Sequence, residues 1–313
     1  MNSMIKSLVI ALLLVTGVTA SVADDIQIYT TDNSNAKITG ESIEKVFTDA
    51  GFVISGNNDM NPPFKGKFQE TYHKVYRLFT YHNNDLLMEL VKVSPRAALF
   101  APLSSSIYMK NGSNDISIST LSLDGMAKIT GISATNKHMI EYDKLIKETI
   151  AKALPNGHFE KITFKPLKAK NELVTIFTYE MDLEEGDDLE DELDGLEVEL
   201  EGSLETAGFV IAGFNKLGED FADAGYDKYD FFDAYSICKL RVIFEVHKTH
   251  PEAGALAPCS LYLYKEKGSS VVHMAYPSVY NWFSSLAISD KASVDVLVNA
   301  QKVMVDVINE VTE

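Results

Sequence analysis

An internal repeat constrains this chain more than any other feature, because a pattern carried twice folds into the same unit twice. The segment Ala50 to Ile54 reads Ala-Gly-Phe-Val-Ile, and the same five residues recur from Ala207 to Ile211. Residues 79–119 also align with residues 235–275 without a gap, and the two blocks share ten identical residues. The sequence therefore predicts two similar domains within its 313 residues, which is enough chain for each to bury its own core.

The order of predicted elements repeats as well. In the first half, alternating apolar residues and turn signals predict strands at 26–31, 52–55, 75–81, 107–110 and 116–121, and helices at 42–50, 85–93 and 139–153. In the second half they predict strands at 174–181, 209–212 and 235–238, a hairpin over 261–276, and helices ending at 207 and covering 240–246 and 293–311. We expect an α+β fold in which helices cover one face of each antiparallel sheet.

The first residues have the character of a secretory signal peptide. Lys6 precedes an apolar run from Leu8 to Val15, and small residues follow up to Ala20 or Ala23, where cleavage is expected. The run is too short for a transmembrane helix, and no later segment reaches that length. We therefore predict a signal peptide at 1–23, domains at 24–157 and 158–313, a periplasmic or secreted location, and no stable membrane span after cleavage.

The net charge of the chain limits the classes of partner that it is expected to bind. A formal net charge of −17 argues against nucleic acid and against an anionic membrane surface, since both draw their affinity from Lys and Arg. Fourteen of the acidic residues lie between Glu180 and Glu205 with no Lys or Arg among them. We interpret this run as a solvated helix face. Calcium binding is the alternative, although 182–194 lacks the alternating spacing and fixed glycine of an EF-hand loop.

The second half contains the most informative motif. Cys238 precedes a short apolar helix that runs to Pro251, and the segment from Gly254 to Cys259 reads Gly-Ala-Leu-Ala-Pro-Cys before an alternating strand. In this arrangement the chain resembles the domain-of-unknown-function 302 family. The resemblance covers most of both halves and implies a TATA-binding-protein-like fold for each of two tandem domains. The family has no established activity, so the resemblance implies a fold and little about function.

The resemblance puts Cys238 and Cys259 at the two cysteine positions of the family. His82 and Leu103 stand at these positions in the first half, so the first copy is degenerate and contains no cysteine. From the residues alone, two cysteines in an exported chain suggest a structural disulfide, worth roughly 3 kcal/mol for a loop of this length. A redox-active or ligand-reactive pair and two unpaired buried thiols are the alternatives.

His247 and His250 lie between the two cysteines and are candidate ligand or metal neighbours, because thiolate and imidazole bind zinc and copper. The spacing matches no zinc motif, so a half-buried His247 and an exposed His250 at a helix end are the competing interpretation. Hydrolase, Walker-type and dinucleotide-binding motifs are missing from the sequence, as is the haem attachment motif. We therefore predict no cofactor, no resident metal and no catalytic residue.

Aromatic residues crowd the chain before Cys238. Most of them are expected in the core, and the alternative is that Tyr235 and Phe232, with Pro258, form the wall of an apolar pocket near the cysteines. The sequence favours a non-catalytic exported binding module for an unknown small molecule or protein. A thiol, redox or metal site in the second domain is the alternative, and the two domains are also expected to be able to pair as an intramolecular pseudo-dimer.

Overall fold

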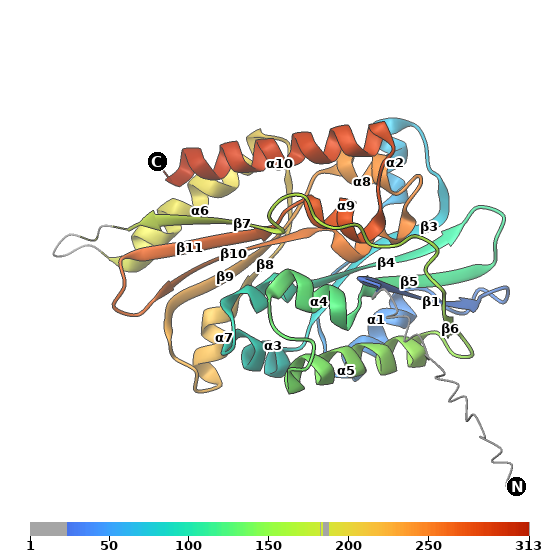
Figure 1. Ribbon diagram of the computed structural model, residues 1–313, viewed down its shortest axis with the longest axis horizontal. Coiled ribbons are helices and arrows are strands. Elements are labelled where there is room, and N and C mark those ends of the chain that lie inside the picture. The colour runs from blue at the N-terminus through green and yellow to red at the C-terminus, as the bar shows by residue number, and fades with distance from the viewer. Residues whose placement is uncertain (1–23, 182, 184–187, 313) are drawn as a thin grey trace, which may run out of the picture.

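The computed structural model describes residues 24–181, 183 and 188–312, and it contains two antiparallel sheets with helices (Figure 1). The predicted α+β class is confirmed. The predicted signal peptide lies outside the described residues, as do parts of the acidic run. None of the helices described is both long enough and apolar enough to cross a membrane.

The first half builds a six-stranded sheet in the order β2-β3-β4-β5-β1-β6. Its elements are β1 (Ile26–Asp32), α1 (Gly40–Asp49), β2 (Val53–Asp59), α2 (Asn61–Phe68), β3 (His73–His82), α3 (Asn84–Val91), the 3-10 helix η1 (Pro95–Phe100), β4 (Leu103–Lys110), β5 (Asp115–Leu121), α4 (Leu123–Thr130), α5 (Lys137–Ala153) and β6 (His158–Phe159).

The second half builds a five-stranded sheet in the order β7-β11-β10-β9-β8. Its elements are β7 (Val174–Glu180), α6 (Leu189–Thr206), β8 (Val210–Lys216), α7 (Leu217–Asp223), β9 (Tyr229–Cys238), α8 (Leu240–Val246), the 3-10 helix η2 (Pro251–Leu256), β10 (Cys259–Glu266), β11 (Val271–Pro277), α9 (Tyr280–Leu286) and α10 (Lys291–Thr312).

The two halves have the same element order, and the strand order of the second sheet repeats that of the first apart from β6. Local signals repeat with them. Gly51 and Gly208 follow the first helix of each half with φ near +80°, a conformation that glycine adopts without steric cost. Each second strand is bulged at the same point, between Ile54 and Gly56 and between Ile211 and Gly213. The repeated sequence thus produces the repeated local geometry.

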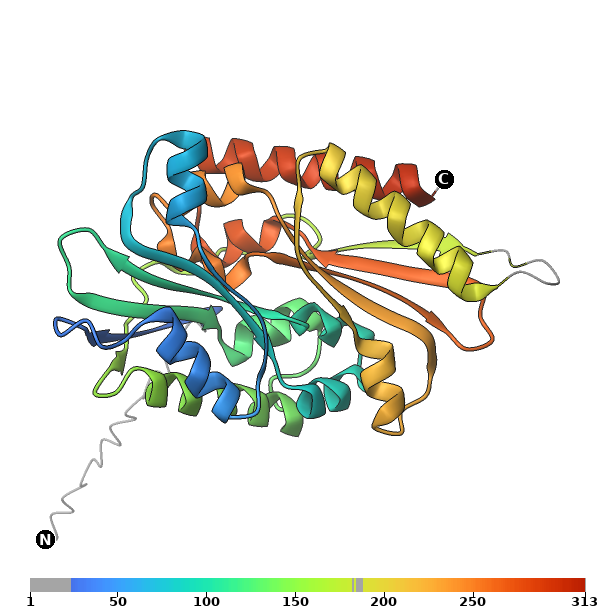
Figure 2. The ribbon, with the colours of Figure 1, turned by 180° about the vertical axis from the view of Figure 1, so that it is seen from behind.

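Long helices cover the outer face of each sheet (Figure 2). Helices α1 and α5 pack together on the first sheet, where the Phe47 ring lies 4.9 Å from that of Phe79 and 4.6 Å from that of Tyr81. Helices α6 and α10 pack together on the second sheet over a cluster that includes Leu200, Leu261 and Ile308. Burying these apolar faces is the main stabilising contribution of the helices.

The inner faces of the sheets are covered by the opposite half. The 3-10 helix η2 packs on β4 and β5 of the first sheet, and η1 packs on β10 and β11 of the second. Two hydrogen bonds are reciprocal: Ser104 Oγ donates to the Pro258 carbonyl and Ser260 Oγ donates to the Pro102 carbonyl, each at 2.9 Å. Equivalent residues exchange equivalent bonds, as in a two-fold symmetric dimer.

The core is not divided between the halves. The sequence predicts a separate hydrophobic interior for each half, and this expectation is wrong, because one cluster of buried apolar residues runs from Ile26 in the first half to Ala300 in the second. A smaller cluster lies only under α6 and α10. The physical reason is the exchange of η1 and η2, which seals each sheet with residues of the other half.

Several short elements are absent from the sequence prediction. Helix α2 contains Pro62, Pro63 and Gly66, so its sequence shows no helical periodicity, and α4, α7 and α9 span only seven or eight residues each. The apolar residues of α10 do not all face the core. Leu297 is buried, but Val298 is 45% exposed because the next residue of a helix points about 100° away.

Candidate functional site

The two cysteines lie on neighbouring strands and are not bonded to each other. Cys238 is the last residue of β9 and Cys259 is the first of β10. Cys259 is paired with Ile237, the residue before Cys238. Both side chains pack against the same apolar cluster and line the same small cavity, and neither thiol is bonded. The predicted structural disulfide is therefore corrected to two free thiols.

Both thiols are weak acids. Burial raises the pKa of Cys238 to about 11. Burial and, secondarily, the neighbouring Cys238 raise the pKa of Cys259 to about 12. The thiolate is the reactive form of cysteine, and at neutral pH both side chains remain protonated. The electrostatics therefore favour a packing role over a nucleophilic one.

A cavity of about 300 Å³ opens between the two halves beside Cys238. The two halves contribute equally to its wall, which is mainly apolar: Asn58, Met60, Pro63, Leu78, Thr80, Val210, Ala212, Cys238, Leu240 and Pro258. A second cavity of about 50 Å³ lies under α8 and α10 and is lined by both cysteines and Pro258. The structure thus brings together three of the residues singled out in the sequence.

The two histidines lie in other surroundings. His247 is buried against α2, with its ring 4.6 Å from Phe64 and 5.3 Å from His73, both in the first half. Burial lowers the pKa of His247 to about 4, so its imidazole is neutral at pH 7. The His250 Nδ1 lies 2.9 Å from Glu252. Among the residues described, no group of three or more His, Cys, Asp or Glu side chains is arranged to hold a metal ion.

The two aromatic residues predicted as pocket wall line neither cysteine cavity. The Tyr235 ring lies 4.7 Å from Phe214 on the helix-covered face. Phe232 packs with Phe221 at 5.8 Å and Tyr264 at 5.0 Å. Alternation along β9 separates these two residues onto opposite faces, a consequence of strand geometry that the sequence cluster alone does not reveal.

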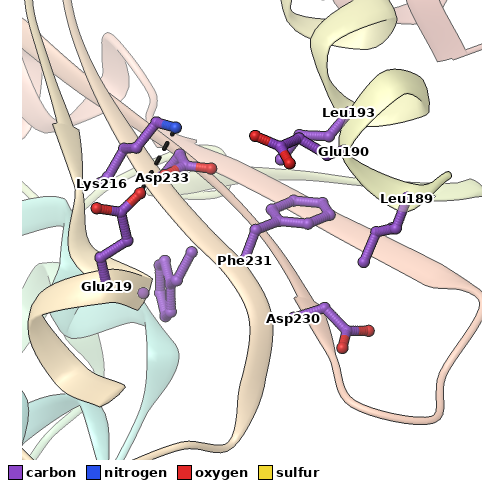
Figure 3. Close-up of a pocket in the computed structure, with 10 residues that line it drawn as sticks. Leu189, Glu190, Leu193, Lys216, Glu219, Asp230, Phe231 and Asp233 are labelled. Atoms are coloured by element: carbon purple, nitrogen blue, oxygen red, sulfur yellow. Dashed lines mark ion pairs between the residues drawn. The ribbon is translucent and has the colours of Figure 1, made fainter. Parts of the chain in front are cut away.

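Sequence reasoning missed an acidic cavity of about 220 Å³ near the start of α6 (Figure 3). Asp233 on β9 contributes to its wall and is buried, and burial, reinforced by Glu197, raises the pKa of its carboxyl to about 7. Lys216 reaches Glu219 at 3.6 Å on the same side of the cavity. A perturbed carboxyl in a cavity is typical of functional sites. The signal available in the sequence was Asp233, an acidic residue directly between the apolar residues Phe232 and Ala234 of β9.

Comparison with known proteins adds little to this description. No family model matches the chain, and no curated protein matches it. Among solved structures, the chain is similar to one described as an uncharacterized conserved protein DUF302 from Bacillus stearothermophilus, at 15% identity and a TM-score of 0.37. The match covers 46% of this chain and 100% of that chain. The fold class rests on the sheets and helices described above.

Proposed function

We propose that this protein is an exported, non-catalytic binding module that holds a small apolar molecule in the cavity between its two halves. The observation that carries the proposal is the cavity of about 300 Å³ lined by both halves, beside Cys238 and Pro258. Ligand sites are concave, mostly apolar and often located where two domains meet. The carboxamide of Asn58 and the hydroxyl of Thr80 are polar groups in the wall that could orient a ligand.

The proposal includes an origin for the cavity. Two tandem domains related to the domain-of-unknown-function 302 family, the first without cysteines, pair as an intramolecular pseudo-dimer, and the cavity forms at their junction. The matching element order and the reciprocal bonds of Ser104 and Ser260 support this arrangement. Export is supported by the sequence of residues 1–23.

Binding of a neutral apolar fluorophore, N-phenyl-1-naphthylamine, tests the proposed cavity. We expect saturable fluorescence enhancement with the wild-type protein and its loss in Ala212→Trp, which fills the cavity. Ser289→Trp is the matched control, since Ser289 is exposed beside a different cavity lined by Tyr280 and Phe283. Equal binding by wild type and Ala212→Trp would place the fluorophore elsewhere and reject the proposal.

Alkylation by iodoacetamide, followed by mass spectrometry, separates a wall cysteine from a reactive one. Because burial raises the pKa of Cys238 to about 11, we expect slow modification at pH 7.5 and faster modification as the pH approaches 11. Bound fluorophore should slow the modification further. Rapid alkylation of Cys238 at pH 7.5 would instead support the alternative thiol or redox role.

A further inference from the structure

The acidic cavity near α6 contains a buried carboxyl group, that of Asp233. Asp233 is only 3% exposed, and no hydrogen bond to its side chain is found among the residues described. Its cross-strand neighbour Lys216 pairs instead with Glu219, and Asp230 pairs with Lys265 at 2.5 Å. Lys216 also lines the cavity, but its ammonium group pairs with Glu219, so the buried Asp233 carboxyl group has no direct ion pair among the described residues, which costs free energy when it is ionised.

The first half shows what occupies the matching place. Arg77 lies opposite Asp59 near the end of β2, as Asp233 lies opposite Lys216 at the end of β8. The Arg77 guanidinium donates to Asn57 at 2.8 and 2.7 Å and pairs with Glu41 at 3.5 Å.

The helices beside these two positions, α1 in the first half and α6 in the second, also differ. Gly40 begins α1, and a Cβ there would lie 2.4 Å from Arg77 Nε, so the guanidinium fills the space beside the helix start. Helix α6 has 18 residues and α1 has 10, and both end before the matching glycines Gly51 and Gly208, so the residue of α6 that matches Gly40 is Glu197. The second half therefore has an acid at both places, Glu197 where the first half has Gly40 and Asp233 where it has Arg77.

We infer that the acidic cavity binds an organic cation, a planar amidinium or guanidinium group on a small apolar body. The charged group would lie against Asp233, which stands where the first half has Arg77, and toward Glu190, which also lines the cavity. The apolar body would lie against Phe231, whose ring separates the α6 side of the cavity from Lys216 and Glu219 (Figure 3). A metal ion is less suited, because the described acids here form no group of three that could hold one.

Binding should depend on pH through Asp233. The groups around it are Glu197 on α6, Lys216 on β8 and Glu219 on α7, and Leu263 is its apolar partner on β10. Burial raises the pKa of Asp233 to about 7, so the carboxyl is mostly protonated at pH 5.5 and mostly ionised at pH 8. A cation binds the ionised form, so affinity should rise as the pH increases through 7.

Isothermal titration of the full mature protein with benzamidine tests the inference, with neutral benzamide as the isosteric control. At pH 8 we expect benzamidine to bind at least about ten-fold more tightly than benzamide, and to lose about thirty-fold in affinity at pH 5.5. Equal binding of the two compounds would show an apolar cavity without charge recognition and would overturn the inference. Binding of Ca²⁺ in place of benzamidine would also overturn it.

Two pairs of variants locate the site. Asp233→Asn should abolish benzamidine binding, whereas Asp223→Asn, an exposed change on α7, should leave it unchanged. If Asp233→Asn does not fold, Glu190→Gln serves the same purpose, because Glu190 is exposed at the start of α6, with the neighbouring Asp191→Asn as its control. Unchanged affinity in both Asp233→Asn and Glu190→Gln would contradict the inference. Ala212→Trp should not affect benzamidine, which keeps this test independent of the cavity between the halves.

Discussion

His247 illustrates at the residue scale how the junction of the halves determines side-chain chemistry. Its Nδ1–H donates to the Phe244 carbonyl at 2.7 Å, and its Nε2 has no hydrogen-bond partner among the described residues. The ring is 1% exposed and lies close to His73 and Lys248. Protonation of the His247 imidazole would put a positive charge beside the Lys248 ammonium group and the titratable His73 ring. His247, a candidate ligand or metal neighbour in the sequence, is thus a neutral and tightly packed side chain in the structure.

The pH dependence of stability should reflect this burial. The folded-state pKa of His247 is about 4, below the ordinary value of 6.5, so the unfolded chain binds a proton that the folded chain rejects between these values. Stability should therefore fall as the pH drops from 6.5 to 4, with about 3 kcal/mol from this residue. Urea unfolding at both pH values should show a smaller loss for His247→Phe than for wild type. His158→Gln, an exposed change, should behave as wild type.

At the scale of elements, η2 and β4 meet with almost no space between them. A Cβ on Gly254 would lie 2.4 Å from the Ser106 Cβ and 2.9 Å from its Cα, and Ser106 Oγ donates to the Pro251 carbonyl at 2.7 Å. The matching residue of η1 is Ala98, which is buried, so at that position the structure accommodates a Cβ. Glycine at 254 is therefore required by close approach to a strand.

We expect Gly254→Ala to lower the free energy of unfolding by about 1–3 kcal/mol, because the strand backbone cannot move away without disturbing the sheet. The matched change, Ala98→Gly, removes a buried methyl and should cost about 1 kcal/mol. Denaturant unfolding followed by circular dichroism compares the two. A neutral effect of Gly254→Ala would show that η2 is displaced from β4 more easily than the contacts suggest.

For the whole molecule, stability should be shared between the halves. Because η1 and η2 cover the opposite sheets and one core runs through both halves, residues 24–157 and 158–313 should be unstable when expressed separately. Each would expose the inner face of its sheet to water. We expect aggregation or dye binding by each half alone, and a single folded species on co-expression, measured by size-exclusion chromatography. A soluble, cooperatively unfolding 24–157 fragment would show that the first half has a sufficient core of its own.

The sequence by itself determined most of the local structure of this protein. The repeated Ala-Gly-Phe-Val-Ile segment and the apolar periodicities predict strands and helices through interactions among near neighbours, and the structure contains these elements. Helix α2 is missing from the sequence prediction because its sequence has no helical periodicity, so the helix depends on packing and not on a local pattern.

The tertiary structure alone decided how the halves combine and where cavities form. The pairing of β9 with β10 brings Cys238 and Cys259 to neighbouring strand ends as free thiols, and the exchange of η1 and η2 joins apolar residues of both halves in one large cluster. Asp233 became a candidate site only when the structure placed it in a cavity, at the position where the first sheet has Arg77. These features depend on contacts between residues far apart in the chain, and a linear pattern of residue types carries no measure of such contacts.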